Sequence, residues 1–173
     1  LELINGFCEI HDDVQSGRPV RNGKDAVWWV WGPAQAINAG DGMHSLARLV
    51  ASRIGEYGFS QDESFGVVRK LDDATLLTCE GRYRDLEMQD QLLVSKDSYV
   101  RTAQEKVGAF FGAAFSIAAF LAGMDKRIVT RLSETGSKLG EAFQIGRDIK
   151  ELWEHGDADA SVDFLNKKKL YPV

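Results

Sequence analysis

The chain has 173 residues, of which 44% are hydrophobic, enough to bury the core of one domain over residues 1–173 or of a large piece of one. Its 21 basic and 26 acidic residues give a formal charge of −5 without any basic stripe, which argues against nucleic acid as a partner. Cys8 and Cys79 have neither CxxC nor Cys/His spacing, so they indicate no disulfide framework and no zinc site, and we expect a cytoplasmic protein.

The first segment has the period of a helix with one buried face. Apolar residues recur at steps of three and four from Leu1 to Val14, and "SGRPVRNG" then breaks the pattern into a loop. The next apolar run, "AVWWVW" at 26–31, is short and indicates a buried connector. A second helix is predicted from Pro33 to a stop near Gly55 or Gly58.

The rest of the chain shows three more helical patterns, over 67–90, 98–123 and 126–154. The most apolar stretch, Ala109 to Gly123, has about 15 residues and is too short to span a membrane, so it predicts a helix buried on all sides. The small residues Gly108, Gly112 and Ala113 favour close helix packing in a core or at a dimer interface. No alternating strand is visible, and the patterns together predict an all-α bundle.

The two ends of the chain suggest an incomplete domain. The chain begins without Met inside an apolar-periodic segment and stops just after the basic run Lys167–Lys169. We expect this run to be a solvated face, with phosphate contact as the alternative. The segment "GDADA" at 156–160 is expected to be a hinge-like loop.

Carboxylates occur on two helical segments far apart in the chain. Asp12 and Asp13 end the first helix, and Asp148 and Glu151 lie one turn apart on the last one, preceded by Gln144. Oxygen ligands of this kind suit Mg²⁺, which typically uses one or two carboxylates together with phosphate oxygens. Spacing alone leaves open the alternative that these pairs are solvated surface.

Three segments resemble one known family. "LINGFCEIHDDVQSGRPVRNGKDAVWWVWGPAQAINAGDGMHSLA" resembles the first aspartate-rich region, DDxxD followed by Arg-Arg-Gly, of the trans-isoprenyl diphosphate synthases, also called polyprenyl synthetases. "LGEAFQIGRDIKELW" is similar to the second region, FQxxDDxxD, and "QEKVGAFFGAAFSIAAFLAG" to the lysine-bearing segment between them. Their order and spacing agree with the family over nearly the whole chain.

This resemblance implies a helical bundle of the isoprenoid synthase type around a deep central cavity. In that cavity Mg²⁺ bridges an allylic diphosphate to both acidic regions, and the ionised allyl group condenses with isopentenyl diphosphate. The resemblance also implies a homodimer, or a heterodimer with a paralogous synthase, and no membrane-spanning segment. It assigns metal ligation to Asp12, Asp13, Asp148 and Glu151, diphosphate contacts to Arg21, Lys106 and Lys168, and the substrate pocket to Phe7, Cys8 and Gln144.

In this family the residues four and five positions before the first aspartate set the product length, and here they are Cys8 and Phe7. Phe7 would close the pocket floor and favour a short to medium product. The equally weighted alternative is that Phe7 is simply a core aromatic.

The chain also departs from the family pattern. Ser16 replaces the third aspartate of the first region, Asn22 the second arginine, and Arg147 and Glu151 the first and last aspartates of the second region. An intact pair of DDxxD motifs presents six carboxylates, so this chain is expected to bind fewer Mg²⁺ ions, and more weakly. We hypothesise that Arg147 neutralises part of the site by pairing with Asp12 or Asp148.

Other candidates have structural explanations. His11 points about 100° away from its neighbour Asp12 on a helix and is expected to be structural. Trp28, Trp29 and Trp31 are expected in a core or an interface. Three functions therefore stay open: an active prenyltransferase, a non-catalytic diphosphate-binding or partner subunit of an active synthase, and a cyclase-like enzyme that does not use isopentenyl diphosphate. We favour the first.

Overall fold

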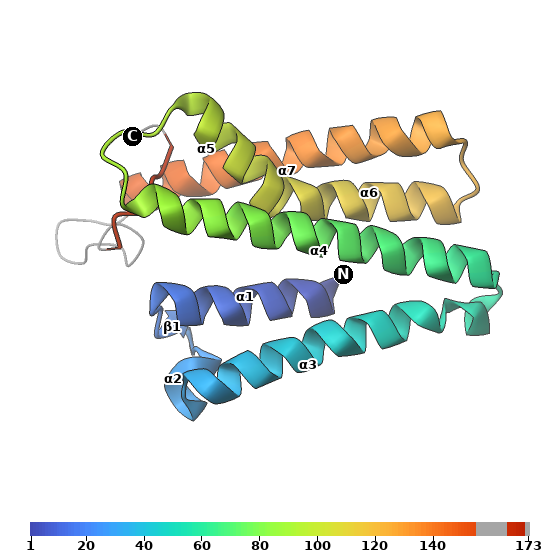
Figure 1. Cartoon of the computed structure of the whole chain (residues 1–173), viewed down its shortest axis with the longest axis horizontal. Helices are drawn as coiled ribbons and strands as arrows, with labels where there is room; N and C mark the ends of the chain where they lie inside the picture. Colours follow the sequence, from blue (N-terminus) through green and yellow to red (C-terminus); the bar gives the residue numbers. More distant parts are fainter. Residues whose placement is uncertain (155–165, 172–173) are drawn as a thin grey trace. The chain divides into compact units, whose positions relative to one another are not determined.

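The structure of the protein is a computed structural model that describes residues 1–154 and 166–171. It divides into two compact units, unit 1 (Leu1–Ser60) and unit 2 (Gln61–Val173) (Figure 1). The described residues are predominantly helical, which confirms the predicted all-α class, and their strands form one short hairpin. The loop predicted at 156–160 lies outside these residues. That residues 1–173 form one domain around a central cavity stays a prediction.

Unit 1 begins with α1 (Glu2–Ser16), the helix predicted from the first apolar period. Its buried face includes Ile4 and Cys8, and it ends at Gly17, whose φ of 64° is left-handed. Glycine adopts this conformation without a steric penalty, and the turn lets the N–H of Arg18 donate to the Asp13 carbonyl at 3.0 Å. The chain therefore reverses directly beside the last turn of α1.

A two-stranded hairpin follows α1, where no strand was predicted. β1 (Val20–Arg21) pairs antiparallel with β2 (Lys24–Asp25), with Arg21 opposite Lys24. Asn22 and Gly23 form the turn with φ of 51° and 73°. An Asn-Gly pair with two positive φ values is the preferred two-residue hairpin turn. Strands of two residues have no room for an alternating pattern, so periodicity could not reveal them.

The remainder of unit 1 consists of α2 (Val27–Trp31), α3 (Pro33–Ser52) and the 3₁₀ turn η1 (Ile54–Tyr57). The prediction of a buried connector at 26–31 is wrong, because α2 is helical and Trp29 and Trp31 are 60% and 66% exposed. Trp28 is anchored differently, since its indole N–H donates to the Arg18 carbonyl at 2.7 Å. α3 ends at Ser52, and η1 ends at Tyr57, directly before Gly58, which matches the predicted stop near Gly55 or Gly58.

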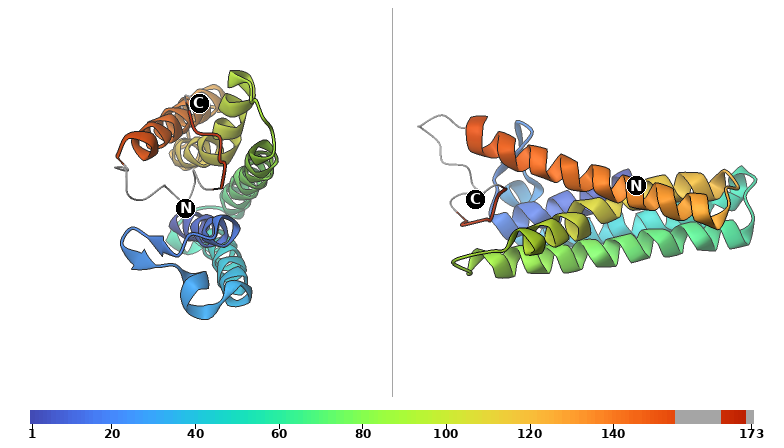
Figure 2. Two further views of the ribbon diagram at one scale, coloured as in Figure 1. Left: turned by 90° about the vertical axis from the view of Figure 1, so that its left-hand side faces the viewer. Right: turned by 90° about the horizontal axis from the view of Figure 1, so that it is seen from above.

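The described residues of unit 2 form four α-helices. They are α4 (Gln61–Gln89), α5 (Lys96–Ala103), α6 (Ala109–Leu121) and α7 (Lys126–Glu154), and the π-helical turn η2 (Gln104–Gly108) joins α5 to α6. The segment predicted as one helix over 98–123 is thus a continuous helical path interrupted by η2. Figure 2 shows α6 running alongside α7, and both α4 and α7 pack against α6.

Small residues bring α6, η2 and α7 into close contact, as predicted. A Cβ added to Gly112 would lie 3.0 Å from the Ser133 carbonyl oxygen, and one added to Gly140 would lie 2.8 Å from the Cα of Gly108. The apolar α6 is mostly covered, but Ala118 is exposed, so the prediction of burial on all sides holds only in part. Among the described helices, none is both long and apolar enough to cross a membrane.

Candidate functional site

The first acidic region lies in unit 1, where the hairpin places Arg21 against the end of α1. The Arg21 Nε lies 2.9 and 3.1 Å from the two carboxylate oxygens of Asp13, and its Nη2 lies 2.7 Å from Asp13 Oδ1. Asp13 is 4% exposed. A buried fork of this kind is among the strongest ion pairs, because it combines two charge-assisted hydrogen bonds.

The charge of Arg21 is held in place by the surrounding carboxylates. Burial lowers the pKa of the guanidinium, but the hydrogen bond and charge of Asp13, with the charges of Asp12 and Glu9, outweigh burial and raise that pKa. The Nη2 also lies 3.4 Å from Asp12 Oδ2, and Nη1 lies 4.0 Å from Glu9 Oε1. Arg21, predicted as a diphosphate contact, therefore also neutralises the carboxylate of Asp13.

Ser16, which stands at the third aspartate position of the first motif, forms a hydrogen bond within its own helix. The hydroxyl of Ser16 donates to the main-chain carbonyl of Asp12 at 2.8 Å. A serine that bonds back to its own helix adds no carboxylate oxygen one turn after Asp12. Asp12 keeps 25% of its side chain exposed, compared with 6% for Asp13. Asp12 is thus the aspartate of this region that is more open to a ligand.

One turn and more before these aspartates, α1 carries the predicted pocket residues. Cys8 is buried, and the Phe7 ring lies edge-on to His11 with centroids 4.7 Å apart and near His44 at 5.3 Å. The His11 Nε2 lies 3.3 Å from the Ile37 carbonyl oxygen and 3.6 Å from Asp41. His11 therefore ties α1 to α3, in agreement with the structural role expected for it.

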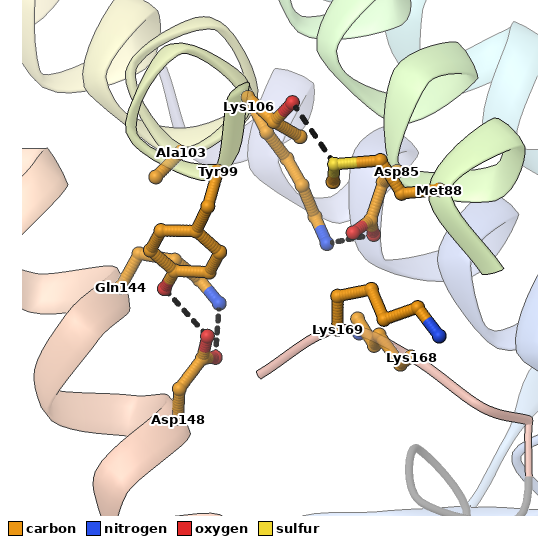
Figure 3. Close-up of a pocket in the computed structure, with 10 residues that line it drawn as sticks. Asp85, Met88, Tyr99, Ala103, Lys106, Gln144, Asp148, Lys168 and Lys169 are labelled. Carbon is orange, nitrogen blue, oxygen red and sulfur yellow. Dashed lines mark hydrogen bonds and ion pairs between the residues drawn. The ribbon is translucent and has the colours of Figure 1, made fainter. Parts of the chain in front are cut away.

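The second acidic region lies in unit 2 and is centred on the buried carboxylate of Asp148. The Tyr99 hydroxyl donates to Asp148 Oδ2 at 2.5 Å, and the Gln144 amide donates to Oδ1 at 2.6 Å (Figure 3). The main-chain N–H of Tyr171 donates to Oδ2 at 3.1 Å. Three neutral donors from α5, α7 and the C-terminal segment thus meet on one carboxylate.

Burial dominates the protonation of these groups. It raises the pKa of the Asp148 carboxyl, although hydrogen bonds from Tyr99, Tyr171 and Gln144 and the charge of Lys106 oppose this shift. Burial and the hydrogen bond to Asp148 raise the pKa of the Tyr99 hydroxyl, so Tyr99 stays a donor at neutral pH. A metal ion at Asp148 would compete with donors that are already in place.

Lysine ammonium groups share this pocket with the carboxylates. Lys106 Nζ lies 2.6 Å from Asp85 Oδ2 on α4, and the two side chains are 9% and 14% exposed. Lys168 and Lys169 approach from the C-terminal segment (Figure 3). The pocket is lined by Asp85, Met88, Tyr99, Thr102, Ala103, Lys106, Gln144, Asp148, Lys168 and Lys169.

The structure brings together part of the predicted second region. Gln144, Asp148, Lys106 and Lys168 line one pocket, whereas Glu151 does not belong to its lining. Arg147 is exposed on α7, and its side chain points about 100° away from that of its neighbour Asp148. In the described chain the hydrogen bonds to the Asp148 carboxylate come from Tyr99, Gln144 and Tyr171, and not from Arg147. The hypothesis that Arg147 neutralises Asp148 is therefore not supported, and its pairing with Asp12 stays a prediction.

Sequence reasoning missed Tyr99 and Asp85. Tyr99 lies seven residues before Lys106, two helical turns away on a similar face, so its spacing could have suggested it. Asp85 lies 21 residues before Lys106, and only the packing of α4 against η2 brings the two together. Lys169 belongs to the basic run Lys167–Lys169, for which phosphate contact is the alternative prediction, and it lines the pocket together with Lys168.

The donor set can be tested against Mg²⁺. Within residues 1–154 and 166–171, no three His, Cys, Asp or Glu side chains gather closely enough to hold an ion. The Asp13 carboxylate accepts hydrogen bonds from Arg21, and the Asp148 carboxylate accepts them from Tyr99, Gln144 and Tyr171. These residues fit an ion held mainly by the oxygens of a bound diphosphate with one carboxylate from the chain, and they do not fit an ion held by protein alone.

Comparison with known proteins identifies the family to which this chain is similar. Residues 1–164 match the polyprenyl synthetase family. The chain is 33% identical to geranylgeranyl diphosphate synthase of Mycobacterium tuberculosis, covering 100% of this chain and 49% of that protein. It is 32% identical to a short chain isoprenyl diphosphate synthase of Methanothermobacter thermautotrophicus, covering 88% of this chain and 46% of that protein.

Solved structures agree with these relatives. Polyprenyl synthetase from Streptomyces coelicolor matches with a TM-score of 0.84 and 34% identity over 98% of this chain and 49% of its own. Geranylgeranyl pyrophosphate synthetase from Pyrococcus horikoshii matches with a TM-score of 0.87 and 29% identity, over 98% and 52%. The chain spans about half the length of the relatives it matches. The chain belongs to the polyprenyl synthetase family.

Proposed function

We propose that this chain carries the diphosphate site of a Mg²⁺-dependent trans-prenyltransferase, which condenses an allylic prenyl diphosphate with isopentenyl diphosphate. The observation that carries the proposal is the cluster of charged side chains in unit 2, where Lys106, Lys168 and Lys169 lie beside Asp85 and Asp148 around a cavity of about 10 Å³. Phosphate oxygens suit the ammonium groups, and carboxylates suit a metal bound to the same phosphates. The family membership and the names of its relatives, synthases of prenyl diphosphates, support the same substrate class.

The residues of the pocket have separate tasks in this reaction. Lys106, oriented by Asp85 at 2.6 Å, and Lys168 stabilise the negative charge that grows on the departing diphosphate. Gln144 and Tyr99 hold the Asp148 carboxylate in one orientation. When bound, Mg²⁺ supplies additional positive charge to the leaving group. Phe7 is proposed to limit the product to short or medium length, with Cys8 beside it.

Chain elongation tests this proposal. The 173-residue chain is incubated with Mg²⁺, labelled isopentenyl diphosphate and either geranyl or farnesyl diphosphate, and labelled prenyl products are separated by chromatography. A longer labelled prenyl diphosphate, lost in Lys106→Gln but kept in the control Lys126→Gln at the exposed start of α7, supports the proposal. Release of diphosphate without elongation would favour a cyclase-like reaction instead.

A second candidate is a non-catalytic prenyl-diphosphate-binding or partner subunit of an active synthase. The first acidic region favours it, because Arg21 saturates Asp13 and the Ser16 hydroxyl bonds to the Asp12 carbonyl. This candidate predicts no elongation by the chain alone, but a changed product length when the chain is added to an active family synthase. Light scattering of the chain alone and of the mixture distinguishes a homodimer from a heterodimer.

A further inference from the structure

The π turn η2 carries Lys106 and is held on two sides by polar side chains. Gln104 donates to Glu141 on α7 at 2.8 Å. Glu105 accepts from Arg84 on α4 at 2.6 Å, and Lys106 lies 2.6 Å from Asp85 on the same helix. Three consecutive residues of η2 thus contact two different helices.

The two contacts with α4 form a matched pair of opposite charges. Arg84 and Asp85 are adjacent on α4, and Glu105 and Lys106 are adjacent on η2, so each positive group faces a negative one. A shift that brought Glu105 to Asp85, or Lys106 to Arg84, would oppose like charges. Lys106 and Asp85 are 9% and 14% exposed, so water screens this pair little. Glu105 is 12% exposed and Arg84 is 35% exposed, so their pair is screened more, but its short N–O distance of 2.6 Å still favours this register.

The main chain of η2 lies unusually close to α4 at the same point. A Cβ added to Gly81 would lie 2.6 Å from the main-chain nitrogen of Lys106. The i→i+5 bonds of a π turn hold one more residue than an α turn, so closing η2 as a regular turn would redirect Glu105 and Lys106. Arg84 is placed to prevent this, because it holds Glu105 from a neighbouring helix.

A second cation at Glu105 provides a comparison within the structure. Arg101 donates to Glu105 at 2.9 Å, but it precedes Glu105 by four residues on the same helical path and is 64% exposed. Burial raises the pKa of the Glu105 carboxyl, but the hydrogen bonds from Arg101 and Arg84 outweigh it and lower that pKa. Both arginines keep Glu105 charged, but only Arg84 joins η2 to α4.

We propose that the Arg84–Glu105 ion pair is a positioning device that fixes η2 on α4 and so aims the Lys106 ammonium into the pocket that contains Asp148. Arg84 acts through Glu105 and does not line this pocket. The inference rests on the proposed function only where it concerns diphosphate binding. The position of Lys106 can be measured without any ligand.

The test compares Arg84→Gln with the matched control Arg101→Gln in the 173-residue chain. The NMR signal of the Lys106 side chain, assigned with Lys106→Arg, is followed together with the Kd for Mg²⁺-pyrophosphate by calorimetry. We expect Arg84→Gln to shift the Lys106 signal and weaken pyrophosphate binding about tenfold, because a displaced ammonium loses part of its charge-assisted contact with the phosphate oxygens. Arg101→Gln should change neither, and Arg84→Lys should restore both in part.

Each outcome has a defined meaning. A Lys106 signal that moves equally in Arg84→Gln and Arg101→Gln, or in neither, overturns the inference. If Arg84→Gln does not fold, Glu105→Gln replaces it, because this neutral isostere removes the same pair and should shift the Lys106 signal in the same way. If no variant binds pyrophosphate, the proposed function is wrong, while the Lys106 signal still decides whether Arg84 positions this residue.

Discussion

Replacing Asp13 by asparagine removes the carboxylate that Arg21 grips. Asp13→Asn preserves the shape of the side chain but leaves the guanidinium, 16% exposed, without its bidentate partner. Removing one member of a buried ion pair typically costs about 3–5 kcal/mol. Asp12 at 3.4 Å and Glu9 at 4.0 Å remain near Arg21 and recover part of this loss. We therefore expect the free energy of unfolding to fall by about 2–3 kcal/mol.

Urea denaturation followed by tryptophan fluorescence measures this change. Trp28 is a suitable reporter, because its indole bonds to the Arg18 carbonyl next to the hairpin that carries Arg21. The control is Asp12→Asn, which removes the same charge one residue away from a more exposed position and should cost less than about 1 kcal/mol. A loss in Asp13→Asn no larger than that in Asp12→Asn would refute the conclusion that Asp13 is the principal partner of Arg21.

Three further results are expected. Gly140→Ala would place a Cβ 2.8 Å from the Cα of Gly108 and should destabilise the chain by about 1–3 kcal/mol in urea, whereas Gly146→Ala, in open space on the same helix, should be neutral or stabilising. Burial raises the pKa of the Asp148 carboxyl, so the folded state binds the proton of this carboxyl more tightly than the unfolded state does. The urea midpoint should therefore fall as the pH rises from the ordinary aspartate pKa to the raised one. Asp148→Asn should make the urea midpoint less dependent on pH in this range. Ser16→Asp should tighten Mg²⁺-pyrophosphate binding roughly tenfold by calorimetry, compared with Ser16→Asn, and an equal effect of both would exclude a role for the added charge.

The helices and their approximate bounds could be predicted from local patterns. The three- and four-residue period of α1, the proline that begins α3 and the glycines at their ends all act within a few residues. Gly108 and Gly112 also predicted close packing correctly, because only glycine lets two backbones approach this far. The short hairpin and the exposed α2 were missed, since neither is long enough to establish a period.

The pairing of charges could not be predicted in the same way. Arg147 stands at a motif position and is predicted to neutralise an aspartate, whereas the buried carboxylate of Asp13 in unit 1 pairs with Arg21, which was predicted only as a diphosphate contact. Its reach to Asp13 depends on the Asn22–Gly23 turn, which folds the chain back against α1.

Residue types and their order were sufficient to establish an all-helical member of the polyprenyl synthetase family and to name Asp12, Lys106, Gln144 and Asp148 as site candidates. The contacts that set the chemistry of those candidates required the folded chain. Lys106 meets Asp85 across 21 residues, and the Tyr171 N–H reaches Asp148 across 23. Electrostatic interactions depend on distance in space, and helix packing sets these distances without leaving a periodic trace in the sequence.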